Sequence, residues 1–310
     1  MDRNEGRALL FLHGWSGSSS YYDPALEAFF KDEELRRDAK VSRVVAVDLR
    51  GHGKSSGEKK PCHLARLAID VEELIEHELD DYRDRKKIIA IGSSMGAAIL
   101  WAHCELFSSK GIEMAVFVDQ APLQYWKGSW DLGSKGLKGP EDLENLQHLL
   151  KTDMVEFAAG NAKACLAQPD SIAKEFMTKM TQHTLRCDPV FLGKLMEDHT
   201  QLDWRDVLKD TWHVPVLNVA GGKSDIFPVE GVAHINQLFS IQGNVKYHRL
   251  EVFQNCGHWL YMEEPHKFMQ VMVHFLMELE SLQVDEEDSP EEYESSSSSS
   301  SSSVIQEEVG

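Results

Sequence analysis

Residues 92–96, with the sequence Gly-Ser-Ser-Met-Gly, decide the fold of this chain. An apolar run precedes them at residues 87–91, and small and apolar residues that favour a helix follow at residues 97–101. The pattern predicts a strand, a sharp turn and a helix, with G-x-S-x-G on the turn. The outer glycines leave the space that such a turn needs. We expect the Ser94 hydroxyl to stand above a sheet at a helix N-terminus, where the helix dipole favours developing negative charge.

Apolar runs alternate with helical stretches along much of the chain. Strands are predicted at residues 8–12, 44–47, 88–91, 114–118, 214–219 and 247–253. Helices are predicted at residues 23–37 and 64–79, from residue 97 to about residue 107, near residues 232–239, and at residues 265–282. The strands are continuously apolar, which is typical of a parallel sheet with helices on both faces.

The alternation breaks between residues 122 and 212, where only helices are predicted, at residues 141–150, 154–166, 171–184 and 189–198. This stretch is too long for a simple crossover and is interpreted as an inserted helical lid. Residues 1–121 and 213–284 would then form the core. Residues 285–310 contain an acidic block and nine consecutive serines, and such a composition predicts a disordered tail.

The composition limits the class of partner. The net charge is −19, and nine of the acidic residues lie in the tail, which has no Lys or Arg. The body is therefore acidic but less so, which disfavours nucleic acid and anionic membranes as partners. A small-molecule substrate is expected, and the oligomeric state is left open.

The chain has five cysteines without C-x-x-C spacing, which disfavours a structural metal site or a disulfide framework. Cys256 lies two residues from His258, but no elbow surrounds it, so it is interpreted as loop filling. The polar start of the chain and the lack of a long apolar run predict a cytoplasmic protein.

Ligands of parallel α/β sheets bind at the carboxyl ends of the strands, so the residues just past each strand matter. Ser94 follows one strand, Asp225 follows another and His258 follows the last. A serine hydroxyl needs a base to take its proton, and His258 is the candidate. Asp225 would fix the tautomer of the imidazole. Asp119, after the strand at residues 114–118, is the rival acid; Asp225 is preferred because residues 119–122 look like the entrance to the lid.

A tetrahedral intermediate also needs two donors for its oxyanion. The expected donors are the main-chain N–H groups of Met95, which follows the nucleophile, and of Trp15, which follows the first strand. His13, Asp48 and Arg50 are interpreted as architectural residues whose hydrogen bonds fix the loop that carries Trp15.

These motifs together resemble the α/β-hydrolase superfamily over about residues 7–282. The resemblance rests on HGW at residues 13–15, DLRGHGKS at 48–55, GSSMG at 92–96, GGKSD at 221–225 and NCGHW at 255–259. Within the superfamily, the first two motifs and VDQAP at 118–122 are similar to the cofactor-free chloroperoxidase and arylesterase branch. The resemblance implies no metal or organic cofactor. A serine at the elbow disfavours the relatives that use an aspartate nucleophile.

The chain is therefore predicted to be a serine hydrolase that cleaves a carboxylic ester of a small or medium apolar substrate through an acyl-enzyme on Ser94. One alternative is perhydrolysis or cofactor-free halogenation by the same triad. Another is a non-catalytic receptor for a small apolar ligand. The tryptophans of the insertion are expected in the lid core, one or two of them lining the acyl pocket: Trp126, Trp130, Trp204 and Trp212.

Overall fold

The computed structural model describes residues 6–55, 57 and 60–287, the side chains of residues 283–287 excepted. Its centre is a six-stranded parallel sheet with the strand order β2-β1-β3-β4-β5-β6. The strands are β1 (Arg7–Leu12), β2 (Val41–Val47), β3 (Ile88–Ser93), β4 (Ile112–Val118), β5 (Val216–Gly221) and β6 (His248–Phe253). All six coincide with predicted strands, shifted by up to three residues at an end. The predicted parallel sheet is confirmed.

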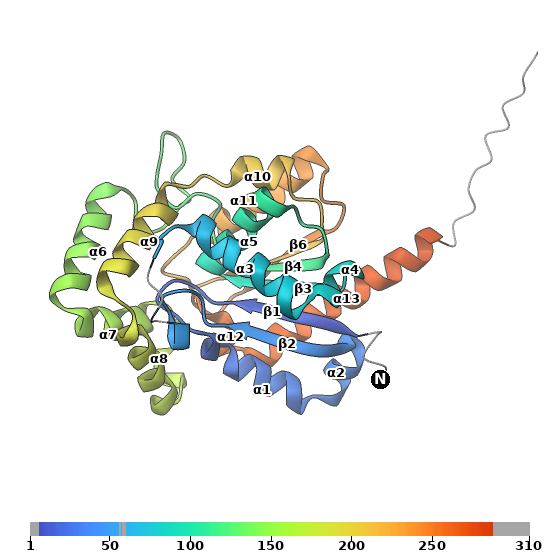
Figure 1. Cartoon of the computed structure of the whole chain (residues 1–310), viewed down its shortest axis with the longest axis horizontal. Coiled ribbons are helices and arrows are strands. Elements are labelled where there is room, and N and C mark those ends of the chain that lie inside the picture. The colour runs from blue at the N-terminus through green and yellow to red at the C-terminus, as the bar shows by residue number, and fades with distance from the viewer. Residues whose placement is uncertain (1–5, 56, 58–59, 288–310) are drawn as a thin grey trace, which may run out of the picture.

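Helices cover both faces of this sheet (Figure 1). One face packs against α3 (Leu64–Glu78), α5 (Met95–Phe107), α10 (Arg205–Asp210) and α11 (Val229–Gln242). The other packs against α1 (Asp23–Lys31), α2 (Glu33–Ala39), α12 (Leu260–Glu263) and α13 (Pro265–Glu287). A short helix, α4 (Asp80–Asp84), precedes β3. Successive residues of β1 alternate between the two cores: Leu10 packs on the first face and Leu9 and Phe11 on the second. Because both faces of the sheet are covered by apolar side chains of helices, the sequences of the strands are continuously apolar.

The single helix predicted at residues 23–37 is wrong, because the chain breaks at Asp32. That residue has extended backbone angles, φ −94° and ψ 107°, and its carboxylate accepts hydrogen bonds from the N–H groups of Glu34 and Leu35, each at 3.0 Å. The side chain thereby caps a second helix, a role that aspartate favours.

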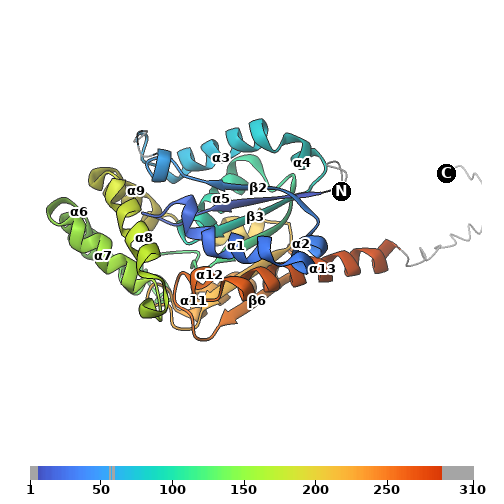
Figure 2. The ribbon, with the colours of Figure 1, turned by 90° about the horizontal axis from the view of Figure 1, so that it is seen from below.

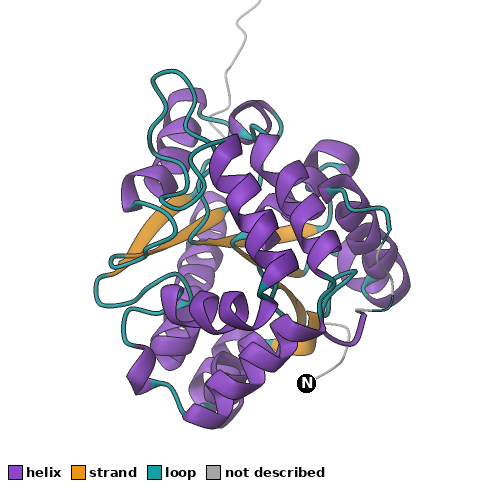
Figure 3. Ribbon diagram, turned by 90° about the vertical axis from the view of Figure 1, so that its left-hand side faces the viewer, coloured by secondary structure: helices purple, strands orange, loops and turns teal. Residues whose placement is uncertain are grey.

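The insertion between β4 and β5 contains the predicted helices, here α6 (Pro140–Thr152), α7 (Met154–Ala164), α8 (Lys174–Arg186) and α9 (Pro189–Gln201). They lie beyond the carboxyl ends of the strands, at the left of Figure 1 and facing the viewer in Figure 3. The helix α10 was not predicted and packs on α5 and α11, within the body. Residues 122–139 form an irregular segment before α6.

The last helix, α13, runs along the body under α1 and α2 and projects past them (Figure 2). Because α13 extends to Glu287, residues 285–287 are helical and are not disordered as predicted. The rest of the predicted tail, residues 288–310, lies outside the described residues. No helix within the described ranges is long and apolar enough to cross a membrane.

Candidate active site

Ser94 sits on a strained turn between β3 and α5. Its φ of 54° and ψ of −126° are unusual for a residue with a side chain, and its N–H donates to Val118 O at 2.8 Å. A Cβ on Gly92 would collide with the backbone of Gly96, and a Cβ on Gly96 would collide with the carbonyl of Leu12. The pattern therefore contains glycine at both positions, because α5 approaches β3 at Gly92 and the end of β1 at Gly96 too closely for any side chain.

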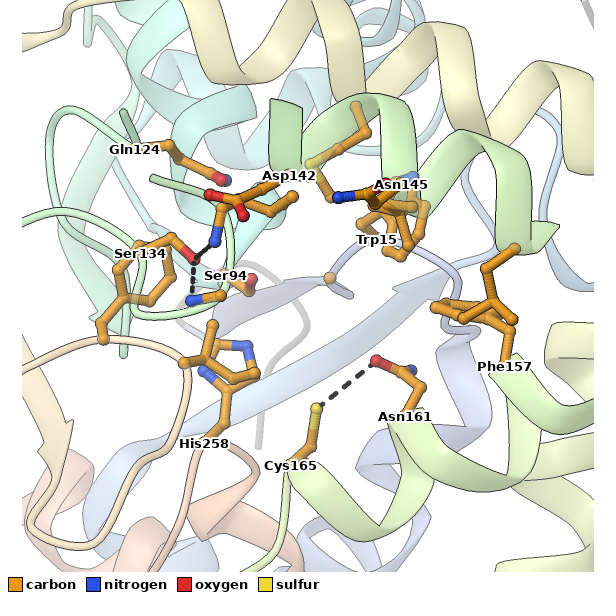
Figure 4. A pocket seen from close by; sticks show the side chains of 18 of the residues that line it. Trp15, Ser94, Gln124, Ser134, Asp142, Asn145, Phe157, Asn161, Cys165 and His258 are labelled. Atoms are coloured by element: carbon orange, nitrogen blue, oxygen red, sulfur yellow. Dashed lines mark hydrogen bonds between the residues drawn. The ribbon is translucent and has the colours of Figure 1, made fainter. Parts of the chain in front are cut away.

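His258 lies in the loop after β6 and is 4 % exposed. Its Nδ1 is 2.6 Å from Oδ2 of Asp119, the residue that follows β4. A carboxylate only accepts hydrogen bonds, so Nδ1 carries the proton and Nε2 is left as the basic nitrogen. His258 and Ser94 line the same pocket, as Figure 4 shows.

Asp119 is fully buried and is held by three donors. Oδ1 accepts from the N–H of Gly221 at 2.9 Å, while Oδ2 accepts from Ser224 Oγ at 2.6 Å and from His258. The backbone of Asp119 has a φ of 49°, a left-handed conformation that aspartate tolerates better than most residues. Water does not reach this carboxylate, so its charge is stabilised by these three hydrogen bonds, which also hold the side chain in place.

The prediction that Asp225 is the acid beside His258 is wrong. Asp225 is exposed on the loop after β5, and the described residues show no hydrogen bond from it to His258. Its neighbour Ser224 points inward instead and bonds to Asp119. The rival position after β4 provides the carboxylate: the N–H of Asp119 still pairs with Val219 O of β5 at 2.7 Å, and its side chain reaches His258.

Ser224 is a residue that the sequence reasoning missed. Its side chain is 1 % exposed, and its Oγ accepts from the N–H groups of Ile226 and Phe227 at 3.2 and 3.3 Å. These two donors orient the hydroxyl so that its proton points to Asp119. The motif GGKSD contains both Ser224 and Asp225, and nothing in its spacing shows which of the two side chains points inward.

The loop after β1 lies directly over the elbow. A Cβ on Gly14 would come within 3.0 Å of Ser94 Cβ, and Gly14 and Trp15 line the pocket with Ser94. Met95 is the first residue of α5, so its N–H has no acceptor within the helix. The loop that carries Trp15 and the first residue of α5 thus both adjoin Ser94, and their role as oxyanion donors stays a prediction.

Buried histidines anchor this loop. His13 Nδ1 donates to Gly14 O at 2.7 Å and its Nε2 accepts from the N–H of Leu49, while His52 Nε2 accepts from the N–H of Ser16 at 3.2 Å. Burial lowers the pKa of His13 to about 3 and that of His52 to about 4, so both rings are neutral at physiological pH.

Asp48 contributes to the same anchor by accepting from the N–H groups of Ser19 and Lys54 at 2.8 and 2.9 Å. The expectation for Arg50 is wrong, because its guanidinium binds Asp70 of α3 at 2.6 and 2.7 Å. His52, which the sequence reasoning did not assign, takes the place expected for Arg50.

The pocket has a volume of about 390 Å³ and two unlike ends. Trp15 and Phe157 lie together at one end, with their ring centroids 5.4 Å apart, and the amides of Asn145 and Asn161 lie beside them. Gln124, Ser134 and Asp142 lie together at the other end (Figure 4). Further apolar lining comes from the insertion helices and the His258 side: Leu146, Leu149, Met196, Ile226, Phe227 and Trp259.

The tryptophans of the insertion do not line this pocket. Trp204 and Trp212 pack into the core of the sheet against Trp101 and Phe117. Trp126 is 41 % exposed and donates to Ser134 O at 3.1 Å. Trp130 is buried in a cluster that includes Leu123 of the insertion. The expectation that the tryptophans form the lid core is therefore wrong for the other three.

Cys256 is buried outside the pocket, and burial raises the pKa of its thiol to about 12, which keeps it protonated. Cys165 does line the pocket, and burial raises the pKa of its thiol as well. Neither sulfur has the thiolate character of a nucleophile.

Comparison with known proteins gives related sequences over most of the chain. It is 24% identical over 285 residues to an AB hydrolase superfamily protein of Bacillus subtilis (strain 168), covering 88% of this chain and 93% of the relative. It is also 24% identical over 279 residues to an sn-1-specific diacylglycerol lipase of Mus musculus, covering 87% of this chain and 80% of that protein.

Solved structures share the fold. An esterase from Exiguobacterium antarcticum matches with a TM-score of 0.73 and 19% identity over 87% of this chain and 91% of its own. A bromoperoxidase from Bacillus anthracis matches with the same TM-score and identity over 87% and 92%. The model of the alpha/beta hydrolase family matches residues 9–271, and the chain belongs to that family.

Proposed function

We propose that this chain is a serine hydrolase that cleaves carboxylic esters, with Ser94 as nucleophile, His258 as base and Asp119 as the acid that orients it. The observation that carries the proposal is the 2.6 Å bond between His258 Nδ1 and Asp119, in the pocket that contains the strained Ser94. Esterases among the structural neighbours support the same class of reaction.

In the first half-reaction, His258 Nε2 takes the Ser94 proton as Oγ attacks the ester carbonyl carbon. The oxyanion of the tetrahedral intermediate accepts from the N–H groups of Trp15 and Met95; losing one such donor typically costs roughly 100- to 1000-fold in rate. As the carbon–oxygen bond of the ester breaks, the imidazolium returns its proton to the leaving alcohol. An acyl group is left on Ser94.

In the second half-reaction, water replaces the alcohol. His258 takes a proton from the water, the hydroxide oxygen attacks the acyl carbon, and Ser94 Oγ leaves with the proton that His258 returns. The products are the carboxylic acid and free enzyme. These steps use only the groups of the chain and water.

The insertion is proposed to act as a lid that selects the substrate. The helices α6, α7 and α9 supply four apolar side chains to the pocket wall, so this segment would contact the substrate: Leu146, Leu149, Phe157 and Met196. A cavity of about 390 Å³ is at the small end of ligand sites, and this suits a small or medium substrate.

A cytoplasmic location of the protein is also a proposal.

The test compares the wild-type protein with Ser94→Ala and with Ser93→Ala as the neighbouring control. Hydrolysis of p-nitrophenyl butyrate and covalent labelling by a fluorophosphonate, mapped by mass spectrometry, should vanish in Ser94→Ala and persist in Ser93→Ala. Circular dichroism checks that both variants fold. Ligand binding without any turnover in the wild type would instead identify a non-catalytic receptor. Replacing water with hydrogen peroxide tests for peracid formation by the same acyl-enzyme.

A further inference from the structure

One end of the pocket contains polar side chains that the proposed hydrolysis does not use. Gln124 is 5 % exposed and lines the pocket, yet its amide forms no hydrogen bond with any described residue. The amide atoms of Gln124 are reached from the pocket and are not sealed off from water. A ligand that enters the pocket can therefore form hydrogen bonds with this amide.

Two more groups complete this end. Ser134 is 3 % exposed, and its Oγ accepts from the N–H groups of Gly136 and Leu137 at 3.3 and 3.1 Å, which leaves its own proton to donate. Asp142 uses Oδ2 for the N–H of Lys138 at 2.8 Å, and Oδ1 has no recorded partner among the described residues. Gln124 and Ser134 are fixed together, because the N–H of Ser134 donates to Gln124 O at 2.8 Å.

The chemistry of the set selects among ligands. An anion is repelled by the Asp142 carboxylate. An ammonium group would satisfy that carboxylate, but as a donor only it would leave the Ser134 proton and the Gln124 NH₂ unpaired. Hydroxyl groups both donate and accept, so two neighbouring hydroxyls can satisfy the carboxylate, the amide and the serine proton together.

The position of this end also says which half of an ester it would hold. The segment that carries Ser134 rests on the loop of Ile226 and Phe227, since the N–H of Lys135 donates to Ile226 O at 2.9 Å. Phe227 in turn packs on His258, with ring centroids 6.0 Å apart. His258 protonates the leaving alcohol, so the alcohol half of the substrate lies on this side. The other end, where the rings of Trp15 and Phe157 form part of the wall, is left for the acyl chain.

We infer that Gln124, Ser134 and Asp142 form a subsite for a polyol, so that the preferred substrate is an ester whose alcohol carries neighbouring free hydroxyls. The inference rests on the proposed function for the assignment of the alcohol side. The subsite itself can be tested without turnover.

The kinetic test measures kcat/KM for three butyrate esters: glyceryl monobutyrate, propyl butyrate and butyrylcholine. The wild-type protein should prefer the glyceryl ester over the propyl ester at least tenfold. Gln124→Leu should lower this ratio roughly five- to tenfold, the effect of about one hydrogen bond. Asp142→Asn, which keeps an acceptor for Lys138, should lower it too. Glu141→Gln, an exposed neighbour outside the pocket, is the control and should leave the ratio unchanged.

The binding test uses calorimetry on Ser94→Ala with 1-O-butylglycerol and butyl methyl ether, neither of which can be hydrolysed. Tighter binding of the glycerol ether, lost on adding Gln124→Leu, supports the subsite even if no ester is turned over, an outcome that would remove only the proposed function. Equal binding of the two ethers, an ester ratio near one that Gln124→Leu does not change, or a preference for butyrylcholine would each overturn the inference.

Discussion

His258 and Ser224 both donate to the same oxygen of Asp119, each at 2.6 Å. The carboxylate therefore links the loops after β4, β5 and β6, and it is reached by no solvent. Two donors on one oxygen compete for its lone pairs, so the strength of the bond to His258 depends on Ser224. This relationship leads to the first two predictions.

Asp119→Asn should lower kcat for p-nitrophenyl butyrate roughly 1,000- to 10,000-fold, because an amide favours the wrong tautomer of the histidine. Asp225→Asn is the matched control on the neighbouring exposed position, and its kcat should stay within twofold. Steady-state kinetics of the two purified variants measure both. A larger loss in Asp225→Asn would return the role of acid to the loop after β5.

Ser224→Ala should lower kcat about tenfold with little change in KM, since it removes a hydrogen bond that orients Asp119. Steady-state kinetics of Ser224→Ala and of the wild type measure how the effect divides between kcat and KM. A variant whose kcat is unchanged, or whose KM rises as much as its kcat falls, would contradict the positioning role.

Phe157→Ala should shift the preferred acyl chain to a greater length, because it enlarges the apolar end of the pocket beside Trp15. Trp126→Ala removes a larger ring from the same insertion but outside the pocket, and should leave the profile unchanged. A panel of p-nitrophenyl esters from acetate to decanoate measures relative kcat/KM. If the two variants behave alike, the acyl chain does not bind beside Phe157.

His199 should make the protein less stable in acid. The ring is 1 % exposed on α9, both its nitrogens lack partners among the described residues, and burial lowers its pKa to about 4. The unfolded chain, with a histidine pKa of about 6.5, binds the proton first as the pH falls. The free energy of unfolding therefore decreases from about pH 6.5 down to about pH 4, by up to roughly 3 kcal/mol for this residue.

His199→Phe removes this titration without breaking a recorded hydrogen bond. The fall in Tm between pH 7 and pH 4.5 should be smaller in the variant than in the wild type, as differential scanning calorimetry would show. His213→Phe, on an exposed histidine, is the control for a general effect of removing a charge. An equal fall in wild type and His199→Phe would show that the ring is not buried neutral in solution.

The sequence by itself determined the parallel sheet, the elbow and the helical insertion. These features follow from local periodicity and from backbone demands: continuous apolar runs need two covered faces, and Gly92 and Gly96 are required by the close approach of strand and helix. Ser94 and His258 could be chosen because each directly follows a strand, and parallel strands bring their carboxyl ends to one edge.

Only the tertiary structure decided which carboxylate faces His258. Asp119 and Asp225 each follow a strand, and a sequence carries no record of which loop turns inward. The left-handed backbone at Asp119 turns its side chain inward, and three hydrogen bonds hold the carboxylate there against His258. The lining of the pocket was decided in the same way. Trp204 packs against Trp101 and Trp212 packs against Phe117, both in the core of the sheet. The burial of such large apolar side chains depends on neighbours from distant segments and not on spacing along the chain.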